Sequence, residues 1–68
     1  MKTSIDAYIR VLESRARFYI NRAKNDHDRN YPAALANCRV VGDFTGEDRW
    51  DVYDRIQHAM YEAEAAAA

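Results

Sequence analysis

Asp54, His58 and Glu62 recur at four-residue spacing and are the side chains best placed to act together chemically. On a helix this spacing puts all three in one row, within reach of one another. Such a row could hold a metal ion or supply a general acid–base pair. Structural zinc sites, however, usually have four ligands and often include cysteine, and this row supplies no such set. The pattern therefore favours a solvent-exposed helix face over a metal site.

Cys38 and the Asp-His-Asp run at residues 26–28 are the other groups that could carry chemistry. A cysteine with a histidine is the minimum set for thiol catalysis, and a loop of acids and imidazole can bind a cation. Cys38, however, lies between Leu35 and Val41, which is typical of a small buried side chain. Residues 25–30 are rich in turn formers, and the chain has no P-loop, dinucleotide-binding or nucleophile-elbow motif. We therefore predict that the protein is not an enzyme and holds no metal or cofactor.

The chain is short and almost neutral, with 68 residues, 10 Lys and Arg against 11 Asp and Glu, and a net charge of −1. A core of this size rarely supplies more than a few kcal/mol, so such domains need disulfides, a metal or self-association. The single cysteine excludes an internal disulfide, and self-association is the favoured supplement. The chain has no apolar run near the roughly 18 residues of a membrane span and no apolar signal segment at its N-terminus. These features predict a cytoplasmic protein without membrane contact.

Charge is divided unevenly along the chain. Residues 1–31 hold seven basic and four acidic side chains (+3), whereas residues 32–68 hold three basic and seven acidic ones (−4). The two halves therefore attract each other. The attraction could act within one chain, between two copies or toward another partner.

Residues 4–24 have the pattern of an amphipathic helix. Ser4 suits the N-cap, and apolar residues then recur at steps of three and four. The stripe that should face a core is Ile5, Tyr8, Ile9, Leu12, Ala16, Tyr19, Ile20 and Ala23.

Val11 and Phe18 fall outside this stripe and make a second, smaller apolar strip. Arg15 and Arg22 set it off from the first. A single partner helix does not easily cover two separate strips, so the second one predicts contact with the third segment or with another chain.

The middle of the chain predicts a turn followed by a short helix. Residues 25–30 form the turn, and Pro32 suits a first helical position because its missing N–H would have no partner there. Residues 33–41 then suit a short buried helix closed by Gly42. Residues 39–44 could instead be extended, because brief apolar runs do not distinguish strand from helix.

Thr45 is the predicted N-cap of a third helix that should run to about Glu64. Its apolar residues, which include Trp50, Tyr53 and Met60, cover an arc of about 200°. Docking against a core needs only about 100°. The excess points outward and again predicts an interface.

These elements predict an all-α fold: a small domain at residues 1–64 with two long amphipathic helices and a short middle helix. Because both long helices bear surplus apolar surface, we expect the core to be completed as a homodimeric helical bundle. Residues 65–68 form an alanine run of the kind that cloning leaves, and we predict a tail outside the domain.

Two nucleic-acid hypotheses arise from charge. Arg10, Arg17 and Lys24 recur every seven residues and could contact phosphates as a line. Conversely, acids of the third helix and its start could imitate a nucleic-acid backbone. These acids are Glu47, Asp48, Asp51, Asp54 and Glu62.

The favoured function is a protein-binding module that acts as a stoichiometric inhibitor or adaptor of a larger protein. Aromatic and arginine side chains beside surplus apolar surface are typical of interfaces. The predicted partners are a second copy and an unidentified protein, and an origin in a phage or mobile element is suggested by size alone. The predicted interface residues are Val11, Arg15, Phe18, Arg22, Trp50, Tyr53 and Met60.

Overall fold

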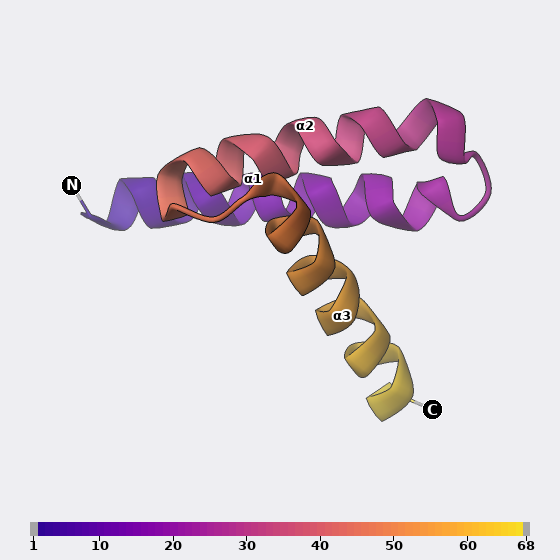
Figure 1. Cartoon of the computed structure of the whole chain (residues 1–68). Coiled ribbons are helices and arrows are strands. Elements are labelled where there is room, and N and C mark those ends of the chain that lie inside the picture. The colour runs from indigo at the N-terminus through magenta and orange to yellow at the C-terminus, as the bar shows by residue number, and fades with distance from the viewer. Residues whose placement is uncertain (1, 68) are drawn as a thin grey trace.

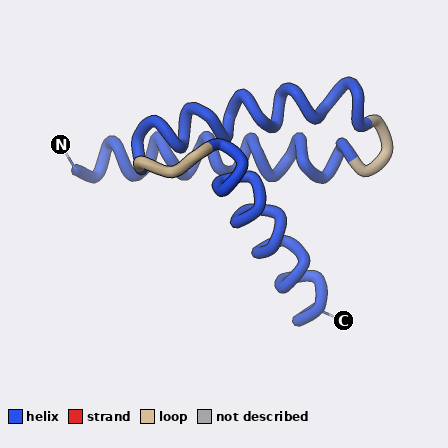
Figure 2. Tube along the Cα trace, viewed as in Figure 1, coloured by secondary structure: helices blue, strands red, loops and turns tan. Residues whose placement is uncertain are grey.

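The described chain consists of three α-helices, α1 (Lys2–Ala23), α2 (His27–Thr45) and α3 (Arg49–Ala67). A computed structural model describes residues 2–67, with side chains from residue 4 onward, so that Met1 and Ala68 lie outside the described residues. Helices α1 and α2 run side by side as an antiparallel hairpin, and α3 crosses the hairpin before its C-terminal end projects away (Figure 1). Short loops join the helices (Figure 2). The predicted all-α, three-helix fold is confirmed.

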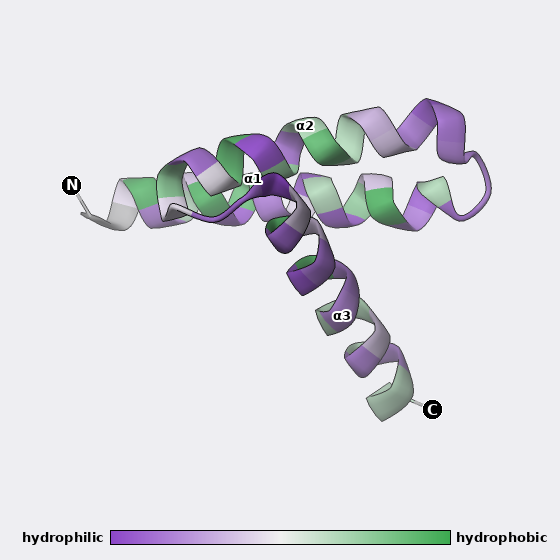
Figure 3. Cartoon of the chain, viewed as in Figure 1, coloured by the Kyte–Doolittle hydropathy of each residue, from purple (hydrophilic) through white to green (hydrophobic). Residues whose placement is uncertain are grey.

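The hydrophobic core lies where α3 crosses the hairpin. Its buried side chains come from all three helices: Leu12, Ala16 and Ile20 of α1; Ala34, Cys38 and Val41 of α2; and Val52 and Ile56 of α3. Ala16 and Ala34 are fully buried, and such small side chains let two helices approach closely. Hydrophobic segments recur along both hairpin helices, whereas the visible ribbon of α3 is largely hydrophilic (Figure 3). We call the side of the hairpin that α3 covers the front face and the opposite side the back face.

The predicted stripe of α1 is confirmed from Ile9 onward. Ile9, Leu12 and the apolar residues after them in the stripe face the core, but Ile5 and Tyr8 are exposed. Tyr8 packs edge-on against Phe44 of α2, with ring centroids 5.6 Å apart. The helix already includes Lys2, so the prediction that Ser4 is the N-cap was wrong.

The predicted short middle helix was also wrong, because α2 and α3 both have 19 residues. Helix α2 begins at His27, inside residues 25–30, which were predicted as a turn. It then continues past the predicted end at residue 41 to Thr45. Residues 39–44 are therefore helical, and the extended alternative is excluded.

Asn30 helps to fix the early start of α2. Its side chain is buried, and its Nδ2 donates a hydrogen bond to the Asp26 carbonyl oxygen at 2.8 Å. Pro32 is in the second turn, where its missing N–H deprives the Asp28 carbonyl of a donor. Asp28 is exposed, so water can bond to that carbonyl and the helix continues.

The helix end was predicted at the wrong glycine. Gly46, not Gly42, caps α2: it has the left-handed φ of 83°, and its N–H donates to the Gly42 carbonyl oxygen at 2.8 Å. Gly42 is buried inside the helix, and a Cβ there would collide with the backbone carbonyl oxygen of Glu47. Glycine at this position therefore lets the α2–α3 loop pass directly over the helix.

Asp48, not Thr45, provides the N-terminal hydrogen bond of α3. Its Oδ2 accepts from the Trp50 backbone N–H at 3.0 Å. Thr45 is the last residue of α2 and uses its hydroxyl within the loop, donating to Glu47 Oε1 at 2.8 Å. At the other end α3 extends to Ala67 and includes residues 65–67 of the alanine run.

An ion-pair network fastens α3 to the front face. Arg55 donates two hydrogen bonds to Glu47, at 3.0 and 3.1 Å, and its Nη1 lies 2.9 Å from Glu13 Oε2 of α1. Hydrogen bonding to Arg55 lowers the pKa of Glu47, and hydrogen bonding to Glu47 raises the pKa of Arg55. Helix periodicity alone does not show that a crossing helix brings Arg55 and Glu13 together.

Candidate interaction surface

Two parallel rows of side chains form the back face of the hairpin. The α1 row, at steps of three and four, is Tyr8, Val11, Arg15, Phe18 and Arg22, and the α2 row is Ala33, Asn37, Val40 and Phe44. Seven large hydrophobic side chains are exposed among the described residues, and four of them are in these rows. The four are Tyr8, Val11, Phe18 and Phe44.

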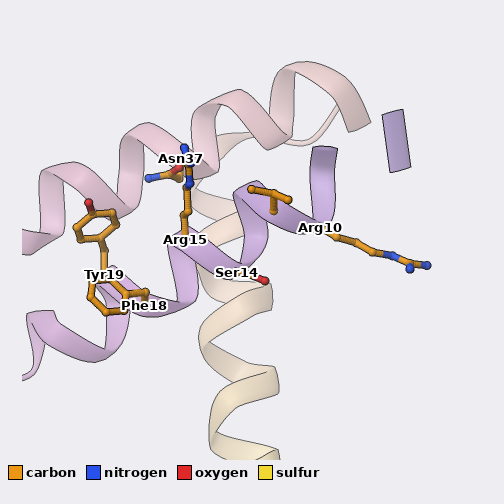
Figure 4. A pocket seen from close by; sticks show the side chains of 7 residues that line it. Arg10, Ser14, Arg15, Phe18, Tyr19 and Asn37 are labelled. Carbon is orange, nitrogen blue, oxygen red and sulfur yellow. The ribbon is translucent and has the colours of Figure 1, made fainter. Parts of the chain in front are cut away.

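The second apolar strip predicted from the sequence is open to solvent. Val11 is 49% exposed and Phe18 is 54% exposed. Both line a wide, shallow depression of about 690 Å³, to which α1 contributes most of the wall and Asn37 is the contribution of α2. Figure 4 shows Arg15, Phe18 and Asn37 on the side of the hairpin away from α3, whose ribbon passes behind. The third helix therefore does not cover this strip.

The arginines of the back face stand beside this apolar surface. The guanidinium of Arg22 lies over the ring of Phe18, 5.3 Å from its centroid, and Arg15 lines the depression. Within residues 4–67, no carboxylate forms an ion pair with Arg15 or Arg22. The back face thus combines exposed apolar groups with positive charges that no acid neutralises within the described chain.

The other predicted interface residues belong to a different surface. Tyr53 and Met60 are half-buried and pack against the core, and burial raises the pKa of Tyr53. Trp50 is 46% exposed. The ring of Tyr31 lies 6.5 Å from Trp50, 5.5 Å from Tyr53 and 4.5 Å from His27, which stacks on it. These aromatic residues join α2 to α3, a grouping that the helix-by-helix pattern does not reveal.

The predicted basic line does not form a continuous free surface. Arg10 borders the back-face depression, whereas Arg17 lines a hollow against the C-terminal half of α3. Lys24 Nζ is 3.2 Å from Glu64 Oε1 and 5.7 Å from the ring centroid of Tyr61. Two of the three cations are therefore beside α3, and the third faces elsewhere.

The predicted acidic face is divided among several local roles. Glu47 is bonded to Arg55, Asp48 supplies the hydrogen bond at the start of α3, and Glu62 is 3.0 Å from His58. The two remaining acids, Asp51 and Asp54, are exposed. At most part of this set can therefore present carboxylates as a phosphate-like row.

The groups considered for chemistry do not assemble within the described residues. No three His, Cys, Asp or Glu side chains among them are arranged to hold a metal ion. His58 and Glu62 pair with each other, and Asp54 does not join them as a third ligand. Cys38 is fully buried, and burial raises its pKa to about 11, so that its thiol is a poor nucleophile at neutral pH.

Comparison with known proteins gives no relative: no family model, curated protein or solved structure matches this chain. No helix in the described part of the chain has the length and apolar character of a membrane-crossing segment.

Proposed function

We propose that the chain is a non-catalytic protein-binding module, an inhibitor or adaptor, that docks a helix of its partner protein on the back face. The observation that carries this proposal is the position of the exposed hydrophobic side chains. Four of the seven gather in the two back-face rows, although the same hairpin buries its front face. Exposed apolar groups collected on one face are typical of protein-protein contact sites.

The spacing of the rows favours a helical partner. Side chains at steps of three and four on two neighbouring antiparallel helices leave a groove between them that fits the ridge of a third helix. On the front face α3 packs against the same two helices, but it crosses them and does not lie along the groove. The back face offers a similar pair of rows with nothing packed on it among residues 2–67.

The residue types also suit an interface. Aromatic and arginine side chains contribute more binding energy than other types, especially where they surround an apolar centre. Phe18, with Arg22 over its ring and Tyr19 edge-on at 5.4 Å, is such a centre. We expect Phe18 to dominate binding.

A second copy of the chain is the other candidate occupant, and the homodimer remains a prediction. Two back faces related by a two-fold axis would bring the Arg15 and Arg22 side chains of both copies into one interface. No carboxylate within the rows would offset the repulsion between these arginines. The proposal therefore commits to a different protein, and self-association is an outcome that the test must detect.

The test compares Phe18→Asp with Tyr61→Asp, a matched control on α3 that is 49% exposed. Proteins captured from the source cell by the wild-type chain are identified, and those retained by Tyr61→Asp but lost by Phe18→Asp are purified and titrated. We expect a defined complex that Phe18→Asp weakens by at least about tenfold. Light scattering on the chain alone is measured in parallel. If no purified protein binds, or if the only effect of Phe18→Asp is to abolish a dimer with twice the chain mass of 7.9 kDa, the back face is not a docking site for another protein.

A further inference from the structure

We infer that the back face is built for an acidic amphipathic helix, one whose docking stripe alternates apolar residues with carboxylates that repeat every seven residues. This inference rests on the proposed function and names the chemistry of the partner. Its basis is the order of residue types along the α1 row, in which two arginines seven residues apart enclose Phe18.

The geometry of the α1 row sets the spacing. Arg15 and Arg22 are two helical turns apart, or about 10.5 Å along the axis at 1.5 Å per residue. Val11 and Phe18 have the same seven-residue spacing and alternate with the arginines. A helix lying along this row meets alternating apolar and cationic positions, so its own stripe must alternate apolar and acidic residues with the same repeat.

The charges on the back face require an acceptor from outside. Docking a helix removes water from Arg15 and Arg22, and an arginine that loses water without gaining an acceptor is costly. Glu13, the carboxylate on α1 nearest to them in sequence, is bonded to Arg55 on the front face. Carboxylates of the partner fit best, because the planar guanidinium binds them through two parallel hydrogen bonds.

The apolar side chains of the back face favour an acidic helix over nucleic acid as the ligand. Phosphates would also neutralise the arginines, but they would bring charged oxygens against Val11 and Phe18. The α2 row contains Val40 and Phe44 and carries no charge, and its nearest cation is Arg29, four residues before Ala33. Only a ligand that is apolar between its negative charges matches both features, and an acidic amphipathic helix is such a ligand.

The inference is tested with designed peptides and the full chain. One 21-residue helical peptide carries Leu and Glu at alternate positions of its docking stripe, and a second carries Lys in place of each Glu. Fluorescence anisotropy measures the binding of each. We expect the Glu peptide to bind at least about tenfold more tightly than the Lys peptide. Raising the salt concentration should narrow this difference.

Charge-reversal variants locate the contact. Arg15→Glu and Arg22→Glu should each weaken the Glu peptide by about tenfold or more and strengthen the Lys peptide. Arg49→Glu makes the same charge change at the exposed first residue of α3, which is outside both rows. Because a carboxylate in a first helical turn is favourable, this control should fold normally and bind as the wild type does.

The outcomes separate the inference from the proposed function. If both peptides bind alike and Phe18→Asp abolishes both, the back face docks helices without a preference for acids, and only the inference is overturned. The inference is likewise overturned if neither peptide binds, or if Arg15→Glu and Arg22→Glu do not shift the preference from the Glu peptide to the Lys peptide. The proposed function is then decided separately, by titration of the protein that the wild-type chain captures. Tighter binding of duplex DNA that Arg15→Glu removes would overturn both.

Discussion

On the front face of the hairpin, Arg55 shares hydrogen bonds and an ion pair with two carboxylates, whereas on the back face Arg15 and Arg22 have no acidic partner within residues 4–67. Arg55 is on α3, whereas Arg15 and Arg22 are both on α1. The charges of the front face are paired because α3 supplies Arg55 and the loop before α3 supplies Glu47. Under the proposal, a partner protein supplies the acids for the two back-face arginines, as the loop and α1 supply them for Arg55.

The apolar residues of the two faces show the same contrast. Val52 is fully buried on the front face, whereas Val11 is 49% exposed on the back face. Hydropathy does not separate the two positions, because the residue is the same. What differs is packing: Val52 is on α3 and packs against the hairpin, whereas no helix among residues 2–67 packs on Val11 of α1. The contribution of each valine to stability therefore depends on where α3 crosses.

Substitution of Gly42 should break the front face most severely. In Gly42→Ala the new Cβ meets the backbone carbonyl of Glu47, which cannot move unless the whole loop shifts. We expect a loss of about 2–3 kcal/mol in the free energy of unfolding, a large part of the stability of so small a domain. Urea unfolding followed by circular dichroism measures it.

Gly46→Ala is the matched control for that steric effect. Gly46 has a left-handed φ of 83° and open space around the added Cβ, so its loss should come from backbone conformation alone, about 1 kcal/mol. Equal losses in the two variants would contradict the close approach of the loop at Gly42.

The sequence predicts the helical fold well and the element boundaries poorly, for identifiable reasons. The periodicity of α1 marks Leu12, Ala16 and Ile20 as core residues, and they are buried. The start of α2 is missed because polar turn formers dominate residues 25–30, and the bond from Asn30 to the Asp26 carbonyl is a feature of the folded chain. Local propensity cannot anticipate such side-chain contacts.

The candidate surface is predictable only in part. The exclusion of Val11 and Phe18 from the main stripe is visible in the heptad pattern, and both are exposed. The role of Phe44 is not visible, because only the antiparallel pairing of α1 with α2 brings it to Tyr8. The front-face network of Arg55 is missed for the same reason, since its partners are on other elements.

Matched valine substitutions sharpen the contrast between the faces. Val52→Ala removes two buried methyl groups and should cost about 2 kcal/mol in the free energy of unfolding. Val11→Ala should change it by less than about 0.5 kcal/mol, because the side chain is half in water and alanine favours helix. Thermal and urea unfolding of the two variants compare them directly. A comparable loss for Val11→Ala would show that the back face contributes to folding, and its interpretation as a free docking surface would be wrong.

Removal of the Arg55 network should have a smaller effect on stability than Val52→Ala, and the effect most dependent on pH. Arg55→Met keeps the apolar stem and removes the charge, and because the pair is partly exposed we expect a loss of about 0.5–1 kcal/mol at pH 7. Hydrogen bonding to Arg55 lowers the pKa of Glu47 from its ordinary value of 4.5. This contribution to stability is therefore complete above pH 4.5 and is lost as the pH falls through the lowered pKa of the folded state.

The stabilities of wild type and Arg55→Met should converge below the lowered pKa of Glu47. Arg29→Met alters an exposed arginine outside the network and should follow the wild type throughout. A difference between wild type and Arg55→Met that persisted unchanged at pH 3 would mean that Arg55 stabilises the front face through the packing of its stem, and the electrostatic contrast between the faces would lose its basis.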